Sequence, residues 1–155
     1  MHLTKCNLCT EVRSHLSVLK EKHPDYYCQP VSGSGNLHSK ICLIGLAPGL
    51  HGANKTGIPF TSDFSGDIIR NLLKELEIED IYITNTVRCY PKNNKPDTRT
   101  INNCQMHNHM EISKLTNIRI IITLGVVAYN QILKMYNFCG NSNKFKHGKV
   151  IKLNK

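Results

Sequence analysis

One stretch, Ile41 to Asp67, constrains the fold of this chain more than any other part of the sequence. It opens with the apolar run Ile41-Cys42-Leu43-Ile44, which is typical of a buried strand. It then breaks at Gly45 and stays irregular until an amphipathic helix begins near Gly66. A strand, a long loop and a helix in this order place the loop at the carboxyl edge of a parallel sheet, where open α/β sheets bind ligands. A loop this long is usually functional, although an ordinary connection with glycines at its turns is the alternative.

Apolar strands alternate with helical stretches through the rest of the chain. This alternation predicts parallel βαβ units and one domain, residues 1–155, with a three-layer α/β/α fold. The central parallel sheet is expected to have about four strands, the last of them missing or incomplete. Strands are expected at 40–46, 81–84 and 118–124, with Val150–Leu153 beginning another, and helices are expected before Pro24 and at 66–78, 98–115 and 125–136. Residues 25–39 are expected to be loop.

The charge balance indicates a polyanionic partner. The chain has 20 Lys+Arg against 11 Asp+Glu, which gives a formal charge of +9. A surplus of this size favours nucleic acid binding; a basic composition inherited from an A+T-rich genome is the alternative. No apolar run approaches the roughly 20 residues of a membrane helix, and the N-terminus has no apolar signal core. We therefore expect a cytoplasmic protein that does not contact membranes.

Four of the seven cysteines are candidate metal ligands. Cys6 and Cys9 form a C-x2-C pair, and Cys89 and Cys104 follow later in the chain. In a reducing compartment such cysteines favour metal or cluster ligation over disulfides. Four thiolates can hold a [4Fe–4S] cluster or a tetrahedral zinc ion, and the spacing does not choose between these. Free buried thiols are the remaining alternative.

The stretch GLAPGLHGANKTGIPFTSD resembles the first motif of the type-b, or family-five, uracil-DNA glycosylases. Two further segments, TNTVRCYPKNNKP and INNC, resemble those that carry the third and fourth cysteines of the iron–sulfur members. The resemblance implies a structural [4Fe–4S] cluster ligated by Cys6, Cys9, Cys89 and Cys104. Three cysteines stand outside the pattern, namely Cys28, Cys42 and Cys139, and Cys42 is expected to be a core residue.

The resemblance also implies a DNA repair activity, the hydrolysis of the N-glycosidic bond of uracil, and of other deaminated bases, in DNA. The base must leave the stack and enter a pocket, and the developing charges require a carboxylate near the sugar and donors at the base. Phe60 then corresponds to the stacking ring and Asp63 to the catalytic carboxylate; core packing and a helix cap are their respective alternatives. Asn94 corresponds to a functional Asn of the branch, with Asn93 as the neighbouring alternative.

Asn85 is a candidate base-binding residue because it directly follows the second strand. Related branches place there the Asn that reads the uracil edge, whereas type-b members often have a small residue. Its amide offers both a donor and an acceptor, which suits a pyrimidine edge, and a strand-end turn residue is the alternative. His107 and His109 lie on a polar helix, and we expect them at the surface rather than as metal ligands.

The last motif of the family, a His-Pro-Ser stretch, has no match in this sequence. The segment FKHGKVIKL resembles the approach to it, so the resemblance implies truncation before the last strand and the DNA-inserting loop. A glycosylase with weakened activity, acting as a monomer on uracil-containing DNA, is the leading hypothesis. A DNA-binding pseudoenzyme and a small zinc-binding nucleic-acid module are the alternatives.

Overall fold

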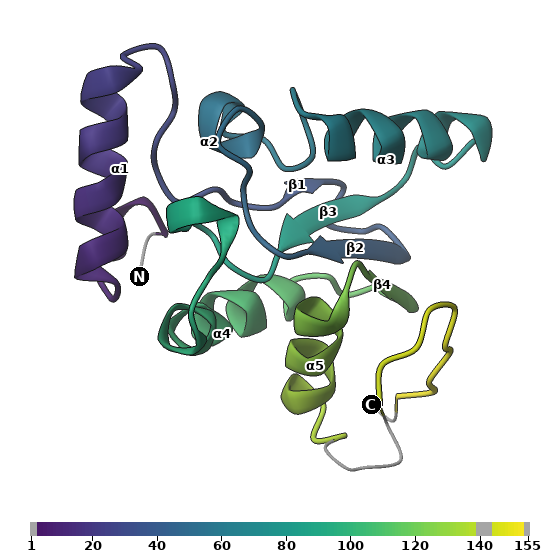
Figure 1. Ribbon diagram of the computed structural model, residues 1–155. Helices are drawn as coiled ribbons and strands as arrows, with labels where there is room; N and C mark the ends of the chain where they lie inside the picture. Colours follow the sequence, from purple (N-terminus) through teal and green to yellow (C-terminus); the bar gives the residue numbers. More distant parts are fainter. Residues whose placement is uncertain (1–2, 139–143, 154–155) are drawn as a thin grey trace.

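The computed structural model of this chain describes residues 3–138 and 144–153 (Figure 1). Helices and strands alternate along most of this part, as the apolar pattern predicts. In chain order the elements are η1 (Leu3–Lys5), α1 (Thr10–Lys22), β1 (Ser34–Gly35), β2 (Ile41–Gly45), α2 (Ala53–Thr56), α3 (Phe64–Glu75), β3 (Tyr82–Asn85), η2 (Lys92–Asn94), α4 (Thr98–Ile112), β4 (Ile120–Thr123) and α5 (Val126–Met135).

The sheet has the strand order β1-β3-β2-β4. Strand β2 lies in its centre and pairs in parallel with both β3 and β4, so that Leu43 stands opposite Ile83 on one side and Ile122 on the other. Strand β1 pairs antiparallel with β3. The prediction of an α/β fold around a mainly parallel sheet is confirmed. Parallel strands end at one edge, so the loops that follow β2 and β3 lie next to each other.

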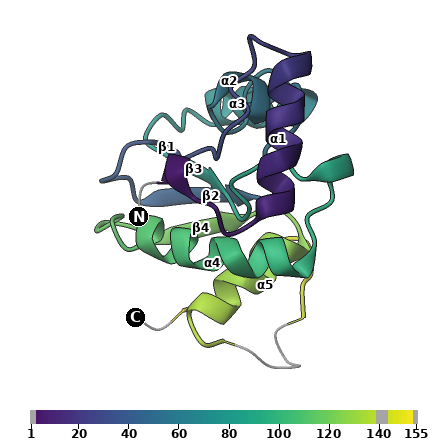
Figure 2. The ribbon, with the colours of Figure 1, turned by 90° about the vertical axis from the view of Figure 1, so that its left-hand side faces the viewer.

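Helices cover both faces of the sheet, which gives the predicted three layers (Figures 1 and 2). Successive side chains of β2 point to opposite faces, because a strand has a period of two residues. Cys42 and Ile44 pack against residues of α4 and α5, and burial raises the pKa of the Cys42 thiol to about 12. Leu43 packs instead with Ile69 and Leu73 of α3. Cys42 is therefore a core residue, as expected.

Helix α1 stands beside this sandwich and covers the segment that follows β3. Its Leu16 and Leu19 form a separate apolar cluster with Cys28 and Tyr90. The helix ends at Lys22, two residues before Pro24, in agreement with the predicted stop. Its N-terminal end thereby brings the Cys6–Cys9 pair close to the loop after β3.

Several local expectations are wrong. Residues 25–39 are not all loop, because Ser34–Gly35 form strand β1 through pairing with β3. Val150–Leu153 form no strand in the described part of the chain. The long loop after β2 contains the short helix α2, which the sequence pattern did not predict. None of the described helices is long and apolar enough to cross a membrane.

Strand β4 is an edge strand, and part of its apolar run is open to solvent. Ile120 is 53% exposed and Ile122 is 38% exposed. A cavity of about 1220 Å³ lies beside the strand, between α5 and residues 144–153.

Candidate active site and cysteine pocket

Asp63 ends the long loop after β2 and begins α3. One of its carboxylate oxygens, Oδ1, accepts a hydrogen bond from the Gly66 amide at 2.8 Å and caps the helix. The other oxygen, Oδ2, lies against Gly49 and Gly52, where an added side-chain carbon would overlap it. The loop therefore folds back over the carboxylate at positions where only glycine fits. The capping alternative is confirmed, and it uses one of the two oxygens.

Phe60 is held in a strained backbone conformation. Its φ is +53°, which costs of order 1–3 kcal/mol for a residue with a side chain. Arg70 stabilises this conformation, because its Nε donates to the Phe60 carbonyl at 2.7 Å and its Nη2 donates to the Pro59 carbonyl at 3.2 Å. Gly66 lies so close to the Phe60 backbone that an added carbon would be 2.6 Å from it. The backbone of Phe60 is thus held by two residues of α3.

Asn85 ends β3 and faces the same point as the Phe60 ring. A carbon added at Gly45 would lie 2.5 Å from Cζ of Phe60 and 2.6 Å from Oδ1 of Asn85. The Asn85 side chain is buried, with the residue 4% exposed, and its Oδ1 has no hydrogen-bond partner among residues 3–138 and 144–153. An unpaired buried acceptor costs about 1–3 kcal/mol. The Phe60 ring and the Asn85 amide oxygen therefore converge on the bare backbone of Gly45, and we use the name Phe60–Asn85 pocket for this group of three residues.

Asn94 is exposed on the turn η2, with a φ of +57°. Among the described residues its side chain makes no hydrogen bond to Asp63 or to the Phe60–Asn85 pocket. Its backbone amide instead donates to the Pro91 carbonyl at 3.0 Å. The structure thus brings Phe60 and Asn85 together and leaves Asn94 at the surface of the loop after β3.

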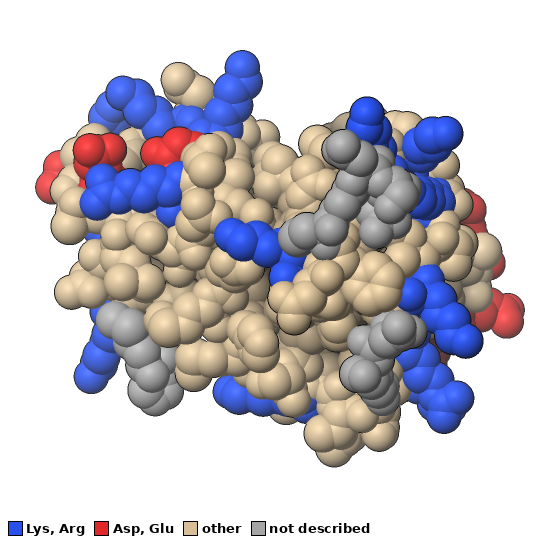
Figure 3. Space-filling model, turned by 90° about the horizontal axis from the view of Figure 1, so that it is seen from below, with Lys and Arg blue, Asp and Glu red and all other residues tan. Residues whose placement is uncertain are grey.

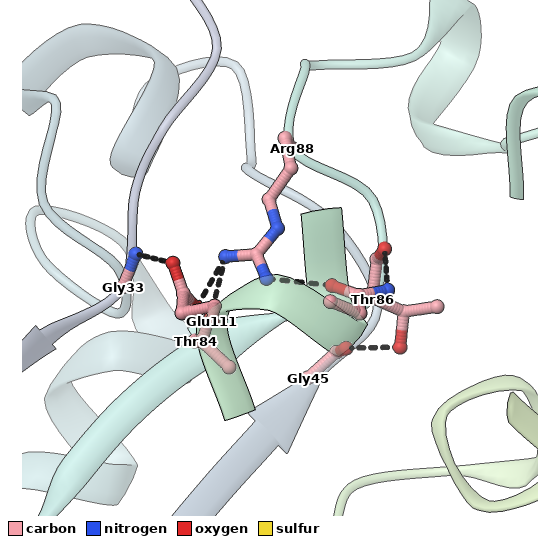
Figure 4. A network of polar contacts seen from close by, with 7 residues as sticks. Gly33, Gly45, Thr84, Thr86, Arg88 and Glu111 are labelled. Atoms are coloured by element: carbon pink, nitrogen blue, oxygen red, sulfur yellow. Dashed lines mark hydrogen bonds and ion pairs between the residues drawn. The ribbon is translucent and has the colours of Figure 1, made fainter. Parts of the chain in front are cut away.

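A buried polar network joins the ends of β2 and β3 to α4 (Figure 4). Arg88, which is 1% exposed, pairs with Glu111 at 2.7 Å and also donates to Thr84. Its Nη2 donates to Asn108 Oδ1 at 2.6 Å, and the Asn108 amide donates to the Thr86 carbonyl at 2.7 Å. We call these residues the Arg88 network. The sequence pattern did not predict this network. The available signal was Arg88, the one charged residue in segment 81–91.

The network continues to the last residue of β2. The Thr86 amide and hydroxyl both donate to the Gly45 carbonyl, at 2.8 and 2.9 Å. On the other side, Glu111 accepts from the Gly33 amide at 3.1 Å, close to β1. The position of Gly45, and with it the Phe60–Asn85 pocket, is therefore set by the same buried contacts that hold Arg88.

The four candidate cysteines line one small pocket. Cys6 and Cys9 precede α1, Cys89 follows β3, and Cys104 lies on α4. Burial, and then the neighbouring Cys104 thiol, raises the pKa of Cys89 to about 12. Burial raises the pKa of Cys104 as well, against a hydrogen bond from the Arg88 amide that lowers it. Burial therefore makes bare thiolates at Cys89 and Cys104 unfavourable, and a bound cation would offset that cost.

Nitrogen donors surround this cysteine pocket. Asn103 donates to the Cys9 sulfur at 3.2 Å, and His107 Nε2 lies 3.2 Å from the Cys6 sulfur. Arg13 and Arg88 also line the pocket, and each has one buried guanidinium nitrogen that no described residue contacts by a hydrogen bond. The described residues include no group of three or more ligands already arranged around a metal position. The residue types nevertheless fit an anionic thiolate-bound group, because thiols and N–H donors converge here.

The expectation for His107 is wrong. The residue is 6% exposed rather than at the surface, because its face of α4 packs against the segment before α1. His109, two residues further along, is exposed as expected. Cys28 is buried away from the pocket and lies 3.5 Å from the Asn54 amide nitrogen. Cys139 lies outside the described residues.

Comparisons with known proteins find sequence similarity over most of this chain. The family model of the uracil DNA glycosylase superfamily matches residues 32–154. The type-5 uracil-DNA glycosylase of Thermus thermophilus is 33% identical over 94% of this chain and 75% of its own length. The type-5 enzyme of Pyrobaculum aerophilum is 30% identical over 96% of this chain and 73% of its length. A type-4 uracil-DNA glycosylase of Thermotoga maritima is 36% identical over 63% of this chain and 51% of its length.

Proposed function

The chain belongs to the uracil-DNA glycosylase superfamily, and we propose from this that it removes uracil from DNA by hydrolysing the N-glycosidic bond, as a step of base excision repair. The observation that carries the proposal furthest is the Phe60–Asn85 pocket. A buried amide oxygen without a partner, next to an aromatic ring, suits a planar polar ligand that donates a hydrogen bond. The N3–H edge of uracil is such a donor. Other deaminated bases with an N–H at the same edge could occupy the same place.

The reaction needs the base out of the stack and the sugar next to a carboxylate. Phe60 would stack on the extruded base, and Asn85 would bind its edge. Asp63 would act near the sugar, where it orients water or stabilises the cationic charge. Its Oδ2 is the oxygen available for this, because Oδ1 is used by the Gly66 amide. Asn94, on the loop after β3, would act as a second catalytic residue.

Gly45→Ala tests this pocket. The purified chain is expected to release free uracil from a uracil-containing oligonucleotide, and the substitution is expected to lower kcat/KM by about 100-fold. The reason is that the added methyl occupies the point that Phe60 and Asn85 face, and displacing a substrate by about 1 Å can cost that much. The measurement is the rate of uracil release from a labelled duplex. A wild-type chain that releases no uracil from any context would overturn the proposed function.

We further propose that Cys6, Cys9, Cys89 and Cys104 ligate a [4Fe–4S] cluster. The four thiols come from the segment before α1, the loop after β3 and α4, so shared ligation would tie these parts together. The group would supply structural cross-linking and no redox step, because base excision transfers no electrons. A reducing compartment such as the cytoplasm suits the free thiols. A zinc ion on the same ligands is distinguished by colour, since an iron–sulfur protein is brown.

Replacing any one of these four cysteines by Ala is expected to remove most of the iron and to lower the yield of folded protein. The matched control is Cys42→Ala, which removes a buried thiol from the core and is expected to leave the iron content unchanged. Iron per chain and the visible absorbance of the purified variants are the measurements. Loss of iron from Cys28→Ala, with iron retained in Cys89→Ala, would show that the ligands are assigned wrongly.

A further inference from the structure

Tyr26 is the centre of a cluster of aromatic and basic side chains beside the long loop. Its ring stacks on His23, with ring centres 4.5 Å apart. Its hydroxyl is hydrogen-bonded to Nδ1 of His51 at 2.8 Å. The Lys55 ammonium lies 5.7 Å from the ring centre, and the Lys20 ammonium donates to the Tyr26 carbonyl at 2.5 Å. We call these residues the Tyr26 cluster.

Backbone contacts hold this cluster against α2. The Tyr27 amide donates to the Lys55 carbonyl at 2.9 Å, and the Cys28 amide donates to the Asn54 carbonyl at 3.0 Å. The C-terminal end of α1, which supplies Lys20, lies beside α2 in both views of the ribbon (Figures 1 and 2). The cluster is thus a fixed surface built from two segments that are distant in the sequence.

The cluster adjoins the side of the candidate active site that carries the carboxylate. His51 lies in the loop between Gly49 and Gly52, and both of these glycines lie against Oδ2 of Asp63. A strand that places its sugar at Asp63 therefore has the Tyr26 cluster next to it. His51, Lys55 and Lys20 are all exposed, so they are accessible to such a strand.

Within the described part of the chain, no carboxylate forms an ion pair with the cations of the cluster. The ion pair between Arg88 and Glu111 is the one found in the described part of the chain. Glu21 and Asp25 are the acidic residues nearest in sequence, and neither forms an ion pair with the cluster. On the face seen from below, Lys and Arg side chains are scattered and do not form one patch (Figure 3). The Tyr26 cluster differs from that face, because its lysines lie next to hydrogen-bonding side chains that are held in place.

We propose that the Tyr26 cluster binds the phosphodiester backbone of the DNA strand next to the extruded nucleotide, an inference that rests on the proposed function. A phosphate suits it better than a base, because the Tyr26 ring is already stacked by His23 and approached by Lys55. The hydrogen bond at Nδ1 of His51 leaves Nε2 as the ring nitrogen for an outside ligand. Lys55 and His51 then supply a positive charge and an N–H donor to one anionic group.

The test is the salt dependence of DNA binding. The probe is a labelled duplex whose uracil is attached to a 2′-fluorinated deoxyribose that resists hydrolysis, titrated by fluorescence anisotropy from 0.05 to 0.5 M KCl. Lys55→Gln is expected to lower the slope of log Kd against log [KCl] by about 0.9, which is the loss of one phosphate contact. Affinity at 0.1 M KCl is expected to fall roughly 8-fold by the same relation. Lys55→Arg is expected to restore the slope.

Two further variants separate this contact from a general effect of charge. Lys114→Gln removes another exposed charge, just beyond α4, and is expected to leave the slope within about 0.2 of the wild type, because no phosphate contact is lost. Tyr26→Phe keeps the ring but frees His51, and is expected to weaken binding about 5-fold with an unchanged slope. Lys55→Gln with the wild-type slope, in a protein that still excises uracil, would overturn this inference alone. Equal effects of Lys55→Gln and Lys114→Gln would overturn it too.

Discussion

Replacing Asp63 by Asn is expected to slow uracil release by about 100- to 10,000-fold, the usual contribution of a positioned acid or base. Asn keeps the side-chain oxygen that accepts from the Gly66 amide, and Asn and Asp cap helices about equally well. The fold should therefore survive, and the loss should come from the missing charge at the second oxygen. The measurement is the single-turnover rate at saturating enzyme, accompanied by the thermal unfolding midpoint.

Asp97→Asn is the matched control for this prediction. Asp97 caps α4 by accepting from the Thr100 amide at 2.6 Å, in the way that Asp63 caps α3. Asp97→Asn makes the same chemical change at the start of a helix. The rate of uracil release is expected to stay within about two-fold of the wild type, because Asp97 is not part of the Phe60–Asn85 pocket. If Asp63→Asn retained more than a tenth of the wild-type rate, Asp63 would be a helix cap and not a catalytic group.

Breaking the buried ion pair is expected to have the largest effect on stability. Glu111→Ala should lower the free energy of unfolding by about 3–5 kcal/mol, because it leaves the buried guanidinium of Arg88 without its countercharge. Among the described residues Arg88 Nε already has no hydrogen-bond partner, so a second unpaired nitrogen would add to an existing desolvation cost. The measurement is denaturant unfolding followed by circular dichroism, on preparations of equal metal content.

Two variants bracket this result. Glu79→Ala removes an exposed carboxylate and is expected to change the free energy of unfolding by less than about 0.5 kcal/mol. The double variant Arg88→Met, Glu111→Met is expected to recover much of the stability lost in Glu111→Ala, because a buried apolar pair carries no desolvation penalty. If Glu111→Ala lowered the free energy of unfolding by less than about 1 kcal/mol, water would have to reach the Arg88 guanidinium, and the expectation would be wrong.

The layers of the fold could be predicted from the sequence because apolar runs report burial directly. The runs around Leu43, Ile83 and Ile122 are local and strong, and they pair as expected. Strand β1 could not be found in this way, since Ser34 and Gly35 have no apolar pattern and become a strand only by pairing with β3. Val150–Leu153 shows the reverse case, where an apolar run does not by itself make a strand.

The residues of the candidate site also fall into two groups, those predictable from local sequence and those that depend on distant contacts. Phe60, Asp63 and Asn85 could be proposed from their places at the ends of β2 and β3 and from the resemblance. Arg70 could not, because its role depends on the left-handed backbone of Phe60. His107 was placed wrongly, because the buried face of a polar helix depends on what docks against it. Arg88 was missed because its partner Glu111 belongs to another element.

The Arg88 network also has a consequence for motion. The Thr86 and Val87 amides, just past the end of β3, donate to the Gly45 and Leu46 carbonyls, both at 2.8 Å. These loop amides should therefore exchange with deuterium as slowly as the sheet itself, because neither loop can open without the buried pair. A pocket that belongs to the most protected unit of a protein keeps its shape before any ligand arrives. Most of the entropy of ordering this site is then lost when the chain folds, and little remains to be lost when DNA binds.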